Sequence, residues 1–92
     1  MGAAPVPAYP AARADVALRR VGSEWVVFDA AGERAHVLNP SAAAVWAHCD
    51  GAHDAAAIAA AIARGLPATE PAAIRGDVDA VLRRFAAEGL FR

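Results

Sequence analysis

The first part of the chain alternates loosely between apolar and polar residues, which is the spacing of β-strands. Val16 to Arg20 follows this pattern and is closed by the turn residues Gly22 and Ser23. Glu24 to Phe28 is richer in aromatic and β-branched residues, which favour strands. Gly32 suits the loop that follows, because glycine readily takes a positive φ. The pattern therefore predicts a hairpin of two strands.

A third strand is predicted over Glu33 to Leu38. Alternation places one set of its side chains on one face and the other set on the opposite face. The first set consists of Arg34, His36 and Leu38, and the second of Ala35 and Val37.

Three helices are predicted after the strands. Asn39 can cap a helix that holds Pro40 in its first turn and stops at Gly51. A second helix is expected from about Asp54 to Arg64. A third, longer helix is expected from about Pro71 to Glu88, with an apolar stripe made of Ile74, Val78, Val81, Leu82 and Phe85.

This order of elements predicts an α+β fold, in which a three-stranded antiparallel sheet is followed by three helices. The 92 residues leave room for one domain, expected over residues 14–92. Residues 1–13 combine alanine and glycine with three prolines and are expected to form a flexible N-terminal arm. The core is expected around the large apolar residues Trp25, Phe28, Trp46, Phe85 and Phe91.

Composition narrows the classes of function. The formal net charge is −1 and all nine basic residues are arginine, so the chain has no excess of positive charge for phosphates, and nucleic acid is an unexpected partner. No apolar run approaches the ~18 residues of a membrane helix, and the N-terminus lacks the pattern of a secretory signal. These features predict a soluble, cytoplasmic protein without membrane association.

Four neighbouring residues, His48, Cys49, Asp50 and His53, include side-chain types that bind zinc. Residues adjacent on a helix point in different directions, whereas structural zinc needs four convergent ligands, so no metal or cofactor is expected. The single Cys49 excludes an internal disulfide. It is expected to be a buried apolar side chain, because no orienting group or oxyanion hole is recognisable for a nucleophile.

Several short motifs resemble the PqqD family. That family has an LN-x-S/T-A entry to the first helix, a C/L-D-G stop, a short second helix and a long last helix that ends in G-L-I/V. The corresponding segments here are Leu38-Asn39-Pro40-Ser41-Ala42, Cys49-Asp50-Gly51 and Gly89-Leu90. The resemblance covers roughly residues 16–91. The strand segment from Trp25 to Pro40 is also similar to PqqD-like proteins that accompany HPr kinase-related proteins.

The resemblance implies a winged helix-turn-helix-like fold that recognises precursors of ribosomally synthesised, post-translationally modified peptides. It implies a protein that is not an enzyme, but holds the leader segment of the precursor as an added strand and presents it to a modifying enzyme. That enzyme could be a radical, kinase-like, cyclising or nucleotidyltransferase-like one. The implied peptide-binding residues, on the third strand and the third helix, are Glu33, Arg34, Ala35, His36, Val37, Leu38, Arg75, Val78, Asp79, Leu82 and Arg83.

Physical reasoning supports this mode of binding, because an open sheet edge can pair with an extended peptide. Arginines beside such a groove would suit an acidic leader. An unpaired edge can also pair with itself, so the chain is expected to be a monomer or a weak homodimer.

Two other functions stay open. The chain could be a small winged-helix regulator that binds DNA or another protein, although the arginines of the third helix are offset by Asp77, Asp79 and Glu88. It could also be an enzyme with Cys49 as the nucleophile.

Overall fold

The three predicted strands form one antiparallel sheet in the order β1-β2-β3. In the computed structural model, which describes residues 5–92, β1 spans Val16–Val21, β2 spans Glu24–Asp29 and β3 spans Arg34–Leu38. Val26 of β2 lies opposite both Arg19 of β1 and Val37 of β3. β2 is therefore the central strand, and β1 and β3 each have one unpaired edge.

Three helices follow the sheet, as predicted: α1 (Pro40–Ala47), α2 (Ala55–Arg64) and α3 (Pro71–Ala87). The Asn39 side chain accepts a hydrogen bond from the Ala42 main-chain N–H at 2.8 Å, which caps the start of α1. Asp54 caps α2 in the same way through Ala57. α1 ends earlier than its glycine stop indicated, because the N–H groups of His48 and Cys49 turn back to carbonyls three residues earlier.

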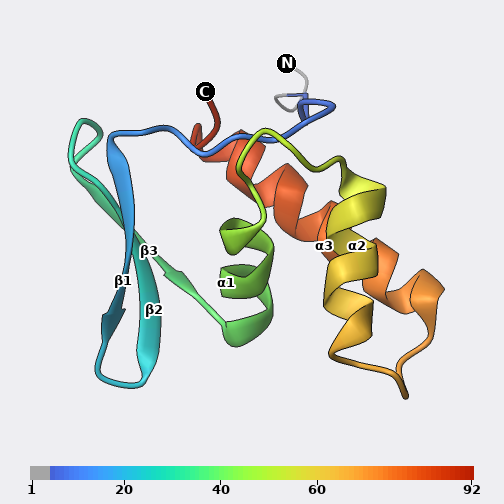
Figure 1. Ribbon diagram of the computed structural model, residues 1–92. Coiled ribbons are helices and arrows are strands. Elements are labelled where there is room, and N and C mark those ends of the chain that lie inside the picture. The colour runs from blue at the N-terminus through green and yellow to red at the C-terminus, as the bar shows by residue number, and fades with distance from the viewer. Residues whose placement is uncertain (1–4) are drawn as a thin grey trace.

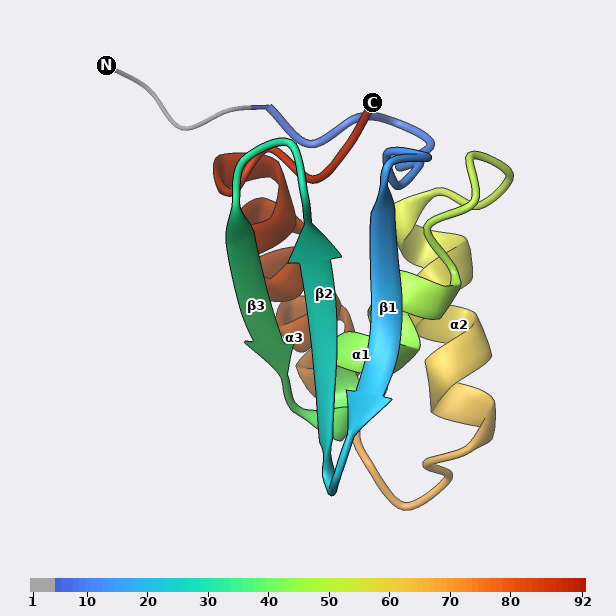
Figure 2. The same ribbon diagram turned by 90° about the vertical axis from the view of Figure 1, so that its left-hand side faces the viewer.

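All three helices lie on one face of the sheet (Figures 1 and 2), with α3 behind β3 and α2 toward the side of β1. α2 and α3 pack against each other, and α1 lies between them and the sheet. None of the helices in residues 5–92 is both long enough and apolar enough to span a bilayer.

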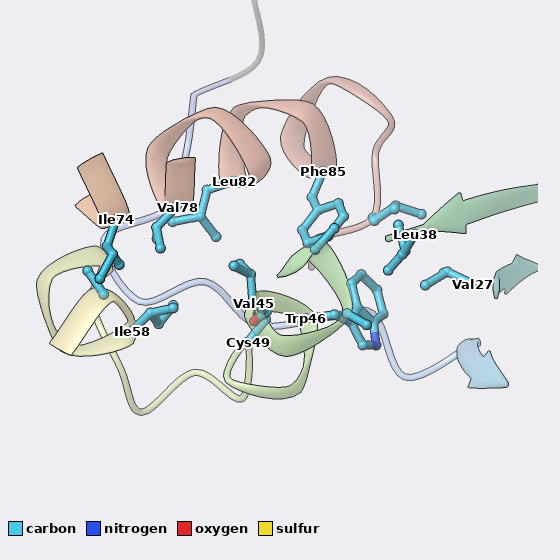
Figure 3. Packing of buried hydrophobic residues seen from close by; sticks show 14 residues of the cluster. Val27, Leu38, Val45, Trp46, Cys49, Ile58, Ile74, Val78, Leu82 and Phe85 are labelled. Carbon is cyan, nitrogen blue, oxygen red and sulfur yellow. Dashed lines mark hydrogen bonds between the residues drawn. The ribbon is translucent and has the colours of Figure 1, made fainter. Parts of the chain in front are cut away.

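The core lies between the sheet and the helices (Figure 3), around Phe85, which is fully buried. The ring of Trp46 meets Phe85 edge-on, and Phe91 packs on the same ring. Phe28, by contrast, is 38% exposed, so the expectation that it belongs to the core was wrong. The antiparallel register puts it on the outer face of the sheet, which the helices do not cover.

The last part of the expected N-terminal arm packs against the domain. Pro10 and Ala11 are buried, and main-chain hydrogen bonds join residues 10–13 to the α1–α2 loop and to the C-terminal residues. The Arg13 guanidinium also donates to the carboxylate of Asp29 and to the Gly89 carbonyl. These contacts hold residues 10–13 in place, whereas residues 1–4 of the expected arm lie outside the described residues.

Candidate peptide-binding site

The free edge of β3 is the first component of the candidate site. The Val37 carbonyl accepts a hydrogen bond from Arg84 of α3 at 3.0 Å, so it points away from β2. Because inward and outward groups alternate along an antiparallel strand, Ala35 also presents its main-chain groups at this edge. Both side chains lie on the outer face, and that of Val37 is 52% exposed. The centre of β3 can therefore accept another strand.

The flank of α3 beside this edge is the second component. Arg84 reaches the Val37 carbonyl, and the carboxylate of Glu88, the residue that follows α3, contacts the Nδ1 atom of His36. Asp77 and Val81 are seven and three residues before Arg84, so helical periodicity places them on the same flank. A strand added to β3 would run beside these four side chains.

Glu88 organises the polar contacts between α3 and β3. One of its carboxylate oxygens contacts His36, while the other accepts from the Arg84 Nε atom at 2.7 Å. The His36 side chain is only 10% exposed, and its buried Nε2 atom has no hydrogen-bond partner among residues 5–92. These contacts form a continuous chain of polar interactions between β3 and the C-terminal end of α3. The chain runs from His36 through Glu88 and Arg84 to the carbonyl of Val37.

An apolar pocket of about 60 Å³ lies between the three helices. Val81 and Asp77 line it together with Ser41, which follows β3 by three residues. The other lining residues come from the core side of α1 and α3, from the last turn of α2 and from the loop between α2 and α3. The pocket therefore lies between the start of α1 and the part of α3 that carries Asp77 and Val81, and it can take the tip of an apolar side chain.

The residues predicted on the third strand lie at or next to this edge, and they differ in how far solvent reaches them. Arg34, Ala35 and Val37 are exposed, the His36 side chain is largely buried beside Glu88, and Leu38 is buried. Glu33 lies in the turn before β3 with a φ of 53°.

The predicted helix residues lie elsewhere. Val78 and Leu82 are 2% and 1% exposed and belong to the core. Arg75, Asp79 and Arg83 line a separate open cavity of about 320 Å³ with residues 6–8 and the start of α2. The structure therefore does not bring Arg75, Asp79 and Arg83 to the free edge of β3.

Sequence reasoning missed the β3-facing flank of α3 for a geometric reason. Asp77, Val81, Arg84 and Glu88 recur at helical spacing, so the stripe itself is visible in the sequence. The apolar stripe of α3 has a polar flank on each side, however, and the sequence does not reveal which one meets the sheet.

The charges of α3 are largely compensated within the helix. Arg75 pairs with Asp79 at 3.1 Å, and Arg84 pairs with Glu88 at 2.7 Å. Such pairs leave little positive potential for a phosphate backbone. The DNA-binding hypothesis finds no support in this helix.

The cluster around Cys49 has structural contacts. Its thiol is buried and donates to the Val45 carbonyl at 3.3 Å. Burial, with the nearby charge of Asp50 as a smaller cause, raises the pKa of the thiol to about 12. The Nδ1 atom of His48 hydrogen-bonds to the Ala44 carbonyl, and His53 pairs with Asp50. A thiol with so high a pKa is poorly suited to act as a nucleophile.

The architecture and the open edge beside α3 define a small winged helix-turn-helix-like α+β domain. The model of the family described as "Coenzyme PQQ synthesis protein D (PqqD)" matches residues 24–90. The chain belongs to the PqqD family. The matched region begins at β2 and ends after α3, so it contains both components of the candidate site.

A solved structure described as "TbiB1 in Complex with the TbiA(beta) Leader Peptide" has a similar fold. The TM-score is 0.74 at 16% sequence identity, and the alignment covers 89% of this chain and 94% of that chain. The search of curated proteins gave no match.

Proposed function

We propose that the chain binds the leader segment of a ribosomally synthesised precursor peptide and presents it to a modifying enzyme. The leader adds to β3 as a fourth strand, and its side chains on one face enter the groove beside α3. The domain itself is a binding module without catalysis. The family membership supports this function, as does the similar fold of TbiB1, which was solved with a leader peptide.

The outward direction of the Val37 carbonyl is the observation that carries the proposal. It indicates that main-chain groups left out of the ladder with β2 face out at the centre of β3, and main-chain pairing is what gives strand addition its affinity. Side chains along the groove then supply specificity. The proposed peptide-contacting residues are Arg34, Ala35, His36, Val37, Asp77, Val81, Arg84 and Glu88.

The chemistry of Cys49 supports the non-catalytic part of the proposal. Its thiol lies in the core and is hydrogen-bonded within α1, away from the free edge of β3. We therefore assign the chemical step to the partner enzyme and the selection of the peptide to this chain.

A backbone amide NMR titration tests the proposal. The isotopically labelled chain is titrated with the leader of a short precursor encoded near its gene, and with a scrambled peptide of the same composition. Shifts confined to β3 and to residues 77–88, with the true leader alone, are the expected result. Shifts centred on β1 or α2, or equal responses to both peptides, would contradict strand addition to β3.

A further inference from the structure

Arg84 occupies the position that an added strand would take. Its Nη2 atom donates to the Val37 carbonyl, and its Nε atom donates to Glu88. Glu88 in turn contacts His36, which anchors the arrangement to β3. The guanidinium is therefore held across the free edge at its centre.

This contact uses an acceptor that the peptide needs. Ala35 and Val37 together offer two N–H and two carbonyl groups at the edge, and Arg84 already bonds one of the carbonyls. A pairing strand would bring its own N–H to the Val37 carbonyl from the same side. The guanidinium must then move away from that carbonyl, while its Nε bond to Glu88 can persist.

The displaced guanidinium needs a replacement acceptor. Its Nε atom is committed to Glu88, but the Nη1 and Nη2 hydrogens remain available, and the Arg84 side chain is 42% exposed. A peptide carboxylate would replace a neutral carbonyl with a charged acceptor and could bind two of these hydrogens at once. A peptide without one would leave the displaced Nη hydrogens with water only, while the Nε bond to Glu88 remains.

We infer that Arg84 caps the free β3 edge in the unbound chain, and that the peptide which displaces it carries an aspartate or glutamate facing α3 beside Val37. This inference rests on the proposed function, because it assumes strand addition at β3. Arg84 becomes a specificity-determining residue that selects acidic leaders. In the unbound chain, the same contact reduces pairing between the edges of two copies.

The neighbouring Arg83 provides a matched control. Arg83 has the same side chain and directly precedes Arg84, but it lies on the other flank of α3, where it lines the cavity near residues 6–8. Removing its charge alters the net charge of the chain as much as removing that of Arg84. Any difference between the two variants therefore reports position, not overall charge.

Selection from a library of short random peptides tests the inference, with the wild-type chain, Arg84→Gln and Arg83→Gln as baits. We expect the wild type and Arg83→Gln to enrich peptides with an acidic residue at a fixed position, and Arg84→Gln to lose that preference. Replacing the acidic residue of a selected peptide by its amide should weaken binding of that peptide to the wild-type chain by about tenfold. The same replacement should weaken binding to Arg84→Gln much less.

The contradicting outcomes are distinct. Peptides that bind all three baits with no acidic preference, or with the same preference in Arg84→Gln, would overturn the role of Arg84 and leave the proposed function intact. Failure of the wild-type chain to enrich any peptide would count against the proposed function and the inference together.

Discussion

Trp46 of α1 stands edge-on to Phe85 of α3, with 5.3 Å between the ring centroids and an interplanar angle of 89°. Phe85 also meets Phe91 in an edge-to-face arrangement, so one buried ring joins α1, α3 and the C-terminal residues. Such aromatic pairs stabilise a fold by more than the burial of their apolar surface alone. α3 is thereby fixed against the rest of the domain at the end that holds Arg84 and Glu88.

Replacing Phe85 by alanine should destabilise the domain strongly. The side chain is fully buried, and deletion of a buried phenylalanine costs about 3–5 kcal/mol through lost burial and the cavity that remains. Urea denaturation followed by circular dichroism measures the loss. Phe28→Ala is the matched control, since Phe28 is 38% exposed, and it should cost much less. Equal losses in the two variants would show that the packing around Phe85 is wrongly described.

Asn39→Ala should lower stability by about 1 kcal/mol, because it removes the side-chain acceptor at the start of α1. Asn39→Asp retains an acceptor in the same place and should keep most of the stability. Thermal unfolding of the two variants separates the cap from other roles of this residue. If both variants lose the same stability, the cap is not the reason for the asparagine.

The stability of the domain should fall in acid through Asp29. The Gly32 N–H and the Arg13 guanidinium hold the pKa of Asp29 below its ordinary value of 3.8. Because the folded pKa is lower than the unfolded one, this contribution is present above pH 3.8 and is lost as the pH falls through the folded value. In Asp29→Asn, the free energy of unfolding should therefore vary less with pH in this range. Urea denaturation at a series of acidic pH values measures this dependence. Equal slopes of the free energy of unfolding against pH for the wild type and Asp29→Asn would contradict the prediction.

Cys49 should be unreactive in the folded chain. With a pKa of about 12, roughly one thiol in ten thousand is ionised at pH 8, and the sulfur is also buried. A disulfide exchange reagent should label Cys49 only as fast as the chain opens, and should label it rapidly in denaturant. Fast labelling of the native chain would reopen a chemical role for this residue.

The sequence predicted the elements well because local signals agree with the tertiary packing. The Asn39 and Asp54 caps and the apolar spacing of α3 all mark features that the structure contains. Alternation in β3 also predicted which side chains share a face, and Leu38 is buried while Val37 is exposed, as it requires. Phe28 was placed wrongly because residue size alone does not determine which face of a strand is buried.

The candidate site was only half visible in the sequence. The third strand could be chosen because family motifs lie beside it, whereas the flank of α3 that meets β3 depends on how the helix rotates when it packs. Arg83 and Arg84 are neighbours in sequence, yet one lines the cavity near residues 6–8 and the other bonds to Val37. The rotation of α3 about its own axis therefore decides which of the two arginines can contact a peptide added to β3.

Strand addition at β3 depends on the outward N–H of Ala35, which a proline removes. Because that group faces away from β2, Ala35→Pro leaves the ladder between β2 and β3 intact, and proline is tolerated on an edge strand. Arg20→Pro is the control at the other edge, since the same alternation turns the main chain of Arg20 outward from β1.

Calorimetric titration of the leader peptide into these two variants and the wild type is the most direct measurement. Both variants should keep the native circular dichroism spectrum. Ala35→Pro should lose binding by about tenfold or more, whereas Arg20→Pro should bind as the wild type does. Unchanged affinity in a folded Ala35→Pro chain, or loss of binding in Arg20→Pro alone, would contradict the account.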